Sequence, residues 1–347
     1  KGQAQARDWN ESLRVLQHMI VELHDGHANV YYFQQPPLTF APYTVGIIEE
    51  QLVVLGADES APASLSVGDV ILAANGQPIT DVIAEARLQI SSPTEQWFNA
   101  SLNMWFATQN VTQLNVEKAD GTQQTIDIDN TLNYEMWSAI PTDPRPTERF
   151  IEMEEGIWYI DLTNLADYSQ LNTQIWDIAQ SGGRIIFDVR GYPYNVPPAI
   201  LGFFHDTPME SSQFLVPIVT APDRANLEFA DGSQSIQPLS QIESRVVFLT
   251  NGSAISYAET FMSFVEAYQL GDIVGEPTAG TNGNVNQFLV PGGFVISWTG
   301  MLVLKHDGSQ HHGVGIQPTI PAHRTLQGVR ENRDELLDVA VETLQSE

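Results

Sequence analysis

Residues 245–261 read RVVFLTNGSAISYAETF and predict a buried strand, a tight turn and a helix in direct succession. The apolar run 246–249 is short and is bounded by turn-forming residues, as is typical of a buried strand. After Ser256, apolar side chains recur at helical spacing, at Ala258, Phe261 and Val265. The pattern therefore places Ser256 at a helix N-terminus, beside unpaired backbone N–H groups and the positive end of the helix dipole.

A serine in this position has two interpretations. It has the beginnings of a nucleophile with an oxyanion site, because the free N–H groups could stabilise developing negative charge. Serine is also a favoured N-cap residue, so Ser256 could cap the helix and do nothing more. The rest of the chain has to decide between these two roles.

The composition excludes several classes of protein and of site. The 347 residues are enough for two or three domains, and no apolar stretch is long enough to span a membrane. The chain has no cysteine, which excludes a disulfide scaffold, a thiol nucleophile and a cysteine metal site. The net charge of −28 would repel nucleic acid and anionic lipid, so we expect neither as a partner.

The pattern along the chain divides it into three blocks. Residues 1–38 carry a helical pattern that ends at the breaker 24–26, next to the sequence D-G-H (25–27), and a Gln-Gln-Pro-Pro linker (34–37) follows. Residues 40–130 contain short strands and two helical stretches, with hairpin turns at Asn75-Gly76 and within 115–128. In residues 150–347 strands alternate with helices, which predicts an α/β layered core.

The middle block resembles a PDZ domain of the kind found in bacterial proteases. The resemblance rests on the string L-x-x-G-D-x-I-x-x-x-N-G-x-x-I (65–79) and on the closing hairpin. PDZ domains bind extended peptides by adding a strand to a sheet edge. A structural β-module without a ligand is the alternative, because such folds are often reused.

A serine nucleophile needs a base, which is usually a lysine of lowered pKa or a histidine held by a carboxylate. Lys305 is the only lysine of the third block, so lysine is nearly excluded. We favour His27, which lies where a helix stops and an apolar strand begins, and could stand at the rim of a cleft. The alternative is that His27 is a polar surface residue of a loop.

Four motifs in a fixed order now resemble the tail-specific, or C-terminal processing, serine peptidases. They are D-x-R-G (188–191), S-x-x-E (256–259), G-E-x-T-x-G (275–280) and G-I-x-P (315–318), preceded by the D-G-H loop and the PDZ-like block. The resemblance implies an α/β multi-domain protein with an N-terminal helical cap, a PDZ-like module and a ClpP/crotonase-like catalytic core. It also implies a serine endopeptidase of unfolded or tail-presented polypeptides, working through an acyl-enzyme on Ser256 without a cofactor or metal.

Departures from the family pattern indicate which branch of the family this chain resembles. The lysine of the Ser/Lys branch should follow Gly280, and Thr281 stands there instead. The chain is thus similar to the tricorn-like branch, whose base is a histidine of an N-terminal loop, matching His27. That branch often has an orienting glutamate where this chain has His312. Glu259, His312 or an acid not yet identified could therefore orient His27.

The oxyanion site is the second departure. The family's N-x-G-G after D-x-R-G is altered here to Tyr-Pro-Tyr-Asn (192–195). We expect the backbone N–H of Tyr257 to hold the oxyanion, together with one N–H from residues 191–195, Gly191 and Tyr194 being the candidates. Asp188 and Arg190 are expected to form a structural ion pair beside the site.

Two other functions were weighed. A metal hydrolase is suggested by the histidine pairs 24/27 and 311/312, but neither has H-E-x-x-H spacing and adjacent histidines on a strand face opposite ways. A catalytically silent homologue that binds peptide or a hydrophobic ligand is the alternative from another class. The resemblance, with Lys1 in place of an initial methionine, leads us to expect an exported, periplasmic or cell-envelope protein of a bacterium.

Overall fold

The computed structural model describes residues 9–33, 37–154, 156–163, 168–194, 196–223 and 225–346. A six-stranded sheet forms the core, in the order β20-β16-β15-β10-β9-β8. All neighbouring strands in it are parallel except β8 and β9. The strands are β8 (Phe150–Glu154), β9 (Ile157–Asp161), β10 (Arg184–Asp188), β15 (Val246–Thr250), β16 (Asp272–Gly275) and β20 (Ile320–Pro321).

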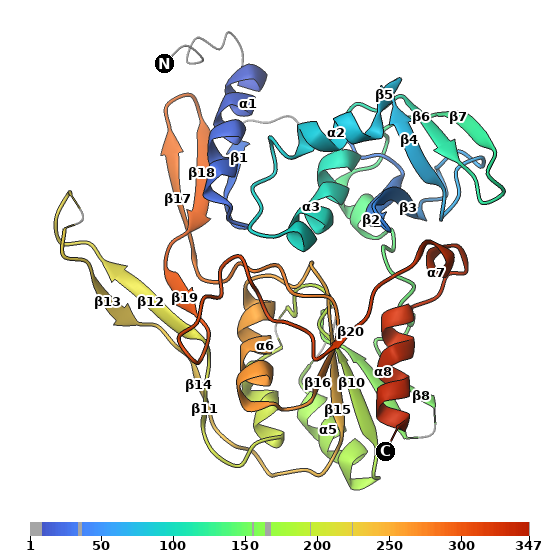
Figure 1. Cartoon of the computed structure of the whole chain (residues 1–347). Coiled ribbons are helices and arrows are strands. Elements are labelled where there is room, and N and C mark those ends of the chain that lie inside the picture. The colour runs from blue at the N-terminus through green and yellow to red at the C-terminus, as the bar shows by residue number, and fades with distance from the viewer. Residues whose placement is uncertain are drawn as a thin grey trace.

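Helices cover both faces of this sheet (Figure 1). One face packs against α5 (Leu171–Gln180), α6 (Tyr257–Tyr268) and the 3-10 helix η2 (Pro198–Phe203). The other face packs against α8 (Glu335–Gln345). All five residues of β15 are buried, as expected for a parallel strand covered on both sides. The predicted α/β layered core and the strand–turn–helix at Ser256 are confirmed.

A second sheet lies above the core, with strand order β2-β3-β4-β6-β7 and β5 paired to β4 (Figure 1). Asn75 and Gly76 both have positive φ, of 49° and 77°, as a two-residue type I′ hairpin turn requires. Helix α3 packs along β2 and buries Phe98, Leu102 and Phe106. The elements are β2 (Tyr43–Ile48), β3 (Gln51–Ala57), β4 (Val70–Ala74), β5 (Gln77–Pro78), α2 (Ile79–Ala86), α3 (Glu95–Ala107), β6 (Gln113–Glu117) and β7 (Gln123–Asp127).

The N-terminal segment forms α1 (Trp9–Ile20), η1 (Val21–Leu23) and β1 (Asn29–Tyr32). Strands β17 (Val285–Val290) and β18 (Phe294–Thr299) do not belong to the core sheet. They leave it and form a three-stranded sheet with β1, which packs on α1 through Phe294 and Ile296. Their strand pattern is local, whereas the choice of partner depends on α1, about 280 residues earlier, so the pattern could not reveal it.

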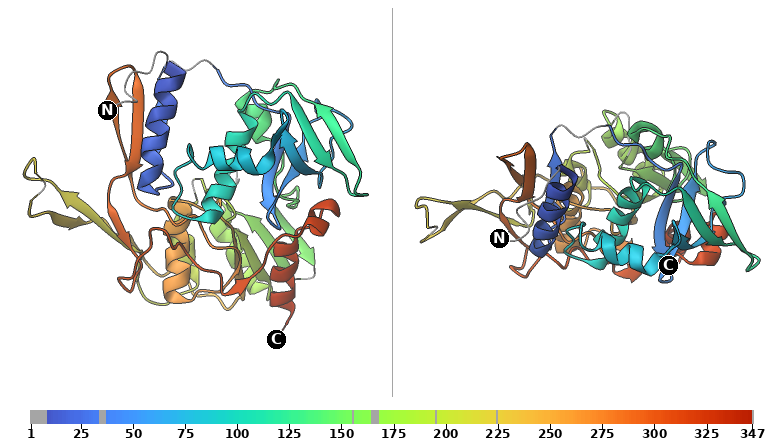
Figure 2. Two further views of the ribbon diagram at one scale, coloured as in Figure 1. Left: turned by 45° about the horizontal axis from the view of Figure 1, so that its top comes forward. Right: turned by 90° about the horizontal axis from the view of Figure 1, so that it is seen from above.

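The remaining elements connect or extend these bodies. The β12–β13 hairpin projects from the core, and β12 also pairs with β19 (Figures 1 and 2). These elements are α4 (Tyr134–Ser138), β11 (Met209–Glu210), β12 (Gln213–Ile218), β13 (Glu228–Asp231), β14 (Ser235–Ile236), β19 (Leu302–Leu304) and α7 (Leu326–Arg330). Most of the predicted linker, residues 34–36, lies outside the described residues, and the division into 1–38, 40–130 and 150–347 stays a prediction. No helix within the described ranges is long and apolar enough to cross a bilayer.

Candidate active site

Ser256 lies between β15 and α6, at the edge of the sheet where the carboxyl ends of the parallel strands meet. Ligand sites of open α/β sheets form at this edge. Its backbone has φ 59° and ψ −111°, a strained conformation for a residue with a side chain. Two backbone hydrogen bonds hold it there, from Ser256 N–H to the Thr281 carbonyl (2.9 Å) and from Thr260 N–H to the Ser256 carbonyl (2.9 Å).

The hydroxyl of Ser256 does not cap α6. Ser256 occupies the N-cap position, but its side chain accepts no hydrogen bond from the first turn. Ser256 and Tyr192 instead line one cavity of about 200 Å³, where burial raises the pKa of the Tyr192 phenol and the serine hydroxyl acts to lower it. This geometry favours the nucleophile over the simple helix cap.

The D-G-H loop reaches this turn from the other end of the chain. Gly26 N–H donates to the Thr281 hydroxyl (2.9 Å), and the carbonyl of the same Thr281 receives the Ser256 N–H. A Cβ atom on Gly26 would stand 2.9 Å from that hydroxyl and 3.0 Å from the Ile255 side chain, so only glycine allows this approach. Thr281, which replaces a lysine of the other branch, thus links His27's loop to the Ser256 turn.

A threonine and an aspartate hold the ring of His27. His27 Nδ1 lies 3.0 Å from Thr299 Oγ1, and this hydroxyl donates to Asp25 Oδ1 at 2.7 Å. Asp25 is buried, and its carboxylate also accepts the N–H groups of Thr299 (2.6 Å) and His27 (3.0 Å). Asp25 is the acid that sequence reasoning left unidentified, and the relay to it through Thr299 is a contact that sequence reasoning missed.

This relay assigns the tautomer of His27. An ionised carboxylate only accepts hydrogen bonds, so the single proton of the Thr299 hydroxyl points to Asp25. Thr299 Oγ1 must then accept from His27 Nδ1–H, which leaves the proton-accepting lone pair on Nε2. Burial is the largest influence on the His27 pKa and lowers it, while Asp25 and Glu259 oppose the shift and His312 adds to it. The ring is therefore neutral at neutral pH, as a base must be.

Neither predicted orienting residue bonds to His27. Glu259 is fully buried and accepts hydrogen bonds from the Thr278 hydroxyl (2.5 Å) and from the N–H groups of Gly280 (2.7 Å) and Thr281 (2.9 Å). It therefore fixes the loop 278–281, and through Thr281 the Ser256 turn. His312 acts on the His27 pKa only by its charge.

The buried neighbour of His312 was missed. The His311 ring is fully buried, and its Nε2 lies 3.3 Å from Glu259 Oε2. Its geometry there satisfies no hydrogen bond at either ring nitrogen. His311 therefore lies over the carboxylate that organises the loop and does not act on His27 directly.

The predicted oxyanion donors differ in their availability. Gly191 N–H donates to the Val189 carbonyl (2.9 Å) and Tyr194 N–H to the Tyr192 carbonyl (2.9 Å), so both are engaged within their own loop. Tyr257 N–H starts α6 and has no hydrogen-bond partner in the part of the chain that is described. Asn195, the end of the predicted segment, lies outside the described residues.

The predicted ion pair of Asp188 and Arg190 is confirmed and belongs to a larger network. Arg190 is 2% exposed and forms two-pronged bonds with Asp188 and with Asp334, from the start of α8. The two arginines Arg145 and Arg190 hold the pKa of Asp188 well below its usual range, against the opposing effect of burial. Arg145 also donates to the Arg190 carbonyl, which ties the network to the loop that begins at Gly191.

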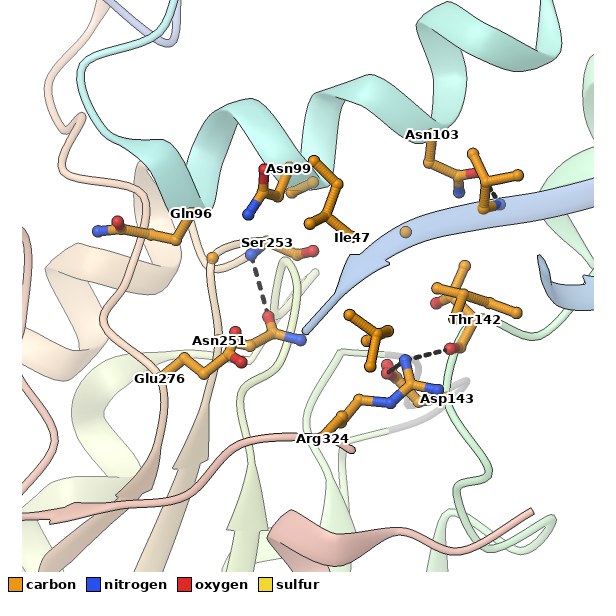
Figure 3. A pocket seen from close by; sticks show the side chains of 16 residues that line it. Ile47, Gln96, Asn99, Asn103, Thr142, Asp143, Asn251, Ser253, Glu276 and Arg324 are labelled. Atoms are coloured by element: carbon orange, nitrogen blue, oxygen red, sulfur yellow. Dashed lines mark hydrogen bonds and ion pairs between the residues drawn. The ribbon is translucent and has the colours of Figure 1, made fainter. Parts of the chain in front are cut away.

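The second sheet together with α3, called here the module with α3, contacts the loops around Ser256. A cavity of about 160 Å³ separates β2 and α3 from the turn 251–253 (Figure 3). At its edge the backbone of Gln96 approaches Gly252 so closely that a Cβ atom there would stand 2.4 Å from the Gln96 carbonyl oxygen. The side chains of Gln96 and Thr94 donate to the carbonyls of Thr278 (2.9 Å) and Ala279 (2.7 Å). The module thus contacts both loops that position Ser256.

A family model described as peptidase family S41 matches residues 206–322, which contain Ser256 and Glu259. The match covers about a third of the chain, and this segment is similar to the peptidases of that family. The match supports a serine-type endopeptidase and does not favour the alternative of a silent binding protein. The matched region does not include His27 or Asp25, so their roles depend on the geometry described above.

Solved structures show the same fold for this chain. Mature CPAF complexed with lactacystin superposes with a TM-score of 0.73 at 15% identity, covering 96% of this chain and 87% of that one. Mature CPAF by itself gives 0.70 at 16% identity, with 96% and 86% covered. A putative peptidase from Parabacteroides merdae gives 0.53 at 14% identity, with 98% and 84% covered. No curated protein matches the sequence.

Proposed function

We propose that the chain cleaves peptide bonds through an acyl-enzyme on Ser256, with His27 as the general base. The single observation that carries this proposal is the anchoring of His27 Nδ1 by Thr299 and Asp25, which leaves Nε2 as the acceptor. The uncapped hydroxyl of Ser256, on a strained turn at a helix N-terminus, supports the role of nucleophile. The match of residues 206–322 to the S41 peptidase family model supports the reaction class.

The chemistry follows from this arrangement. Nε2 of His27 takes the Ser256 proton as Oγ attacks the scissile carbonyl, and returns it to the leaving amine. Asp25 stabilises the imidazolium through the Thr299 hydroxyl, and the Tyr257 N–H donates to the oxyanion. Within the described residues no hydrogen bond joins the His27 ring to Ser256, and we expect this bond to form when substrate binds, as is common for catalytic contacts.

We further propose that the substrates are unfolded or tail-presented polypeptides and that the protein works outside the bacterial cytoplasm. The absence of cysteine is compatible with an exported protein. The 40–130 block, as a PDZ-like module, would help to present the chain end. One feature opposes the addition of a peptide strand to β2, the edge strand of this module. The Asn103 side chain already accepts the Val45 N–H of β2 (2.8 Å; Figure 3).

The test is cleavage of an unfolded protein by the wild type, Ser256→Ala and His27→Ala. We expect cleavage by the wild type alone, with products identified by mass spectrometry. A substrate with an amidated C-terminus, compared with its free-acid form, tests tail recognition: equal rates would exclude it. Cleavage that persists undiminished in Ser256→Ala would contradict the assignment of the nucleophile.

A further inference from the structure

Tyr192 occupies a place in the site that the peptidase reaction as described so far does not use. It follows the Asp188–Gly191 segment and lines the same cavity as Ser256 and Tyr257. Burial raises the pKa of its phenol, and the Ser256 hydroxyl is near enough to act on that pKa, which it lowers. The phenol therefore faces the cavity into which the Ser256 hydroxyl and the start of α6 also open.

Two backbone N–H groups of this loop, those of Gly191 and Tyr194, are engaged within the loop and do not face the oxyanion. Gly191 N–H and Tyr194 N–H are both bonded to carbonyls two residues earlier, those of Val189 and Tyr192. Tyr257 N–H is thus one donor of an acyl-transfer site that is expected to have more than one. A side-chain donor can serve as well as a backbone N–H, and tyrosine is among the residues that do so.

Aromatic contacts fix the position of the Tyr192 ring. The centroids of the Tyr192 and Tyr194 rings are 4.8 Å apart, with an angle of 47° between the ring planes. For Tyr192 and Tyr257 the centroid distance is 6.0 Å and the interplanar angle 37°. Tyr257 is itself held by the bond from its hydroxyl to the Val196 carbonyl (2.9 Å). A donor that is fixed before the reaction stabilises a developing charge without the cost of reorganisation.

We propose that Tyr192 is a catalytic residue whose phenol donates a hydrogen bond to the oxyanion, beside the Tyr257 N–H. The proposal depends on the function proposed for Ser256. As the bond from Oγ to the carbonyl carbon forms, the π electrons of the carbonyl move to its oxygen and the serine proton moves to His27. Tyr192 keeps its own proton throughout. Burial raises the pKa of Tyr192, with Tyr194 adding to the shift, so the phenol stays protonated where His27 is neutral.

The experiment compares the wild type with Tyr192→Phe, which removes one oxygen and keeps the ring. We expect kcat to fall by about 10²-fold or more, as when one oxyanion donor is removed, with KM changed less than about twofold. Tyr134→Phe is the matched control: Tyr134 is 60% exposed on α4, and this change should leave kcat and KM as in the wild type. The melting temperature of each variant shows that it is folded.

A second measurement separates a donor from a packing residue. A peptide aldehyde forms a hemiacetal with the serine whose oxygen occupies the oxyanion position, so its affinity should fall in Tyr192→Phe by the same factor as kcat/KM. A kcat within threefold of the wild type, or an unchanged aldehyde affinity, would overturn the proposal. Failure of the underlying function looks different, because the wild type itself would then neither cleave peptides nor bind the aldehyde.

Discussion

A threonine hydroxyl has one proton and two lone pairs, and this allows Thr299 to stand between His27 and Asp25. Its proton goes to the carboxylate and its lone pair receives the imidazole N–H, so the direction of both bonds is determined. A directly bonded acid would orient the ring in the same way. The two-step arrangement explains how the site can work without an acid at the position of His312.

Thr299→Val tests this arrangement, because valine has nearly the same shape and can neither donate nor accept. We expect kcat to fall by about 10²-fold, toward the lower end of what a general base contributes, with KM nearly unchanged. Thr125→Val on β7, whose hydroxyl bonds only to exposed Asn115, is the control. Steady-state kinetics with one peptide substrate suffice. A kcat within threefold of the wild type would mean that the Thr299 hydroxyl does not orient His27 for catalysis.

The pH dependence of kcat/KM tests the electrostatics of His27. Its folded-state pKa is lowered from the ordinary value of 6.5, chiefly by burial, so the neutral base should persist below pH 6.5 and activity should fall only at more acid pH. Asp25 raises this pKa, so Asp25→Asn should move the acid limb still lower while it reduces kcat. The other charged groups that act on the ring, Glu259 and His312, are unchanged in this variant. An acid limb that moves upward would show that Asp25 does not act on the titrating base.

At the scale of elements, the turn that carries Ser256 is held by a buried carboxylate on its own helix. Glu259 receives three hydrogen bonds from residues 278–281, and the Thr281 of that loop bonds in turn to the turn of Ser256 and to the D-G-H loop. The position of the base thus depends on the loop that Glu259 organises. Its contribution is one of structure, since it has no bond to His27.

Glu259→Gln should therefore lower both stability and activity. The amide NH₂ would face backbone N–H donors, leaving at least one buried donor unpaired next to the strained turn. Because hydrogen bonds to a charged group contribute about 1.5–3 kcal/mol each, we expect a loss of about 3 kcal/mol in the free energy of unfolding. Urea unfolding followed by tryptophan fluorescence measures it. A midpoint equal to that of the wild type would mean that the loop does not need the carboxylate.

The helix and strands that carry the site could be predicted from the sequence, whereas the hydrogen bonds between its side chains could not, for a physical reason. Strand β15, the following turn and α6 are encoded by apolar periodicity and a helix start within one short stretch, so they could be predicted locally. Thr299 bonds to residues more than 270 positions away, across the pairing of β1 with β18. Asp25 was within reach of sequence reasoning, because it stands two residues before His27. Nothing in the pattern, however, indicated the threonine between them.

At the scale of the whole molecule, the net charge of −28 sets the response to salt. Exposed carboxylates repel one another and destabilise the compact state, and salt screens this repulsion. The network of Asp188, Arg190 and Asp334 is buried, and buried pairs are screened much less. We therefore expect the melting temperature to rise between about 0.05 and about 0.5 M NaCl, as measured by calorimetry. A fall would mean that exposed ion pairs outweigh the repulsion.

The fold of the whole molecule brings His27, from the N-terminal segment, and Thr299, from β18, to the turn that carries Ser256. The proposed base comes from the N-terminal segment, the threonine bonded to it from β18, and the proposed nucleophile from the turn after β15. The module with α3 contacts the loops between them through Gln96 and Thr94. Catalysis should therefore require the intact chain, and the site has to be tested in it.

The most direct test of Ser256 and His27 as a working pair is labelling of the full chain with a fluorophosphonate, read by intact mass. We expect one label per wild-type molecule, located on Ser256 by peptide mapping, and none on Ser256→Ala or His27→Ala. Labelling of His27→Ala at the wild-type rate would contradict His27 as the base. A label on any other serine would contradict Ser256 as the nucleophile.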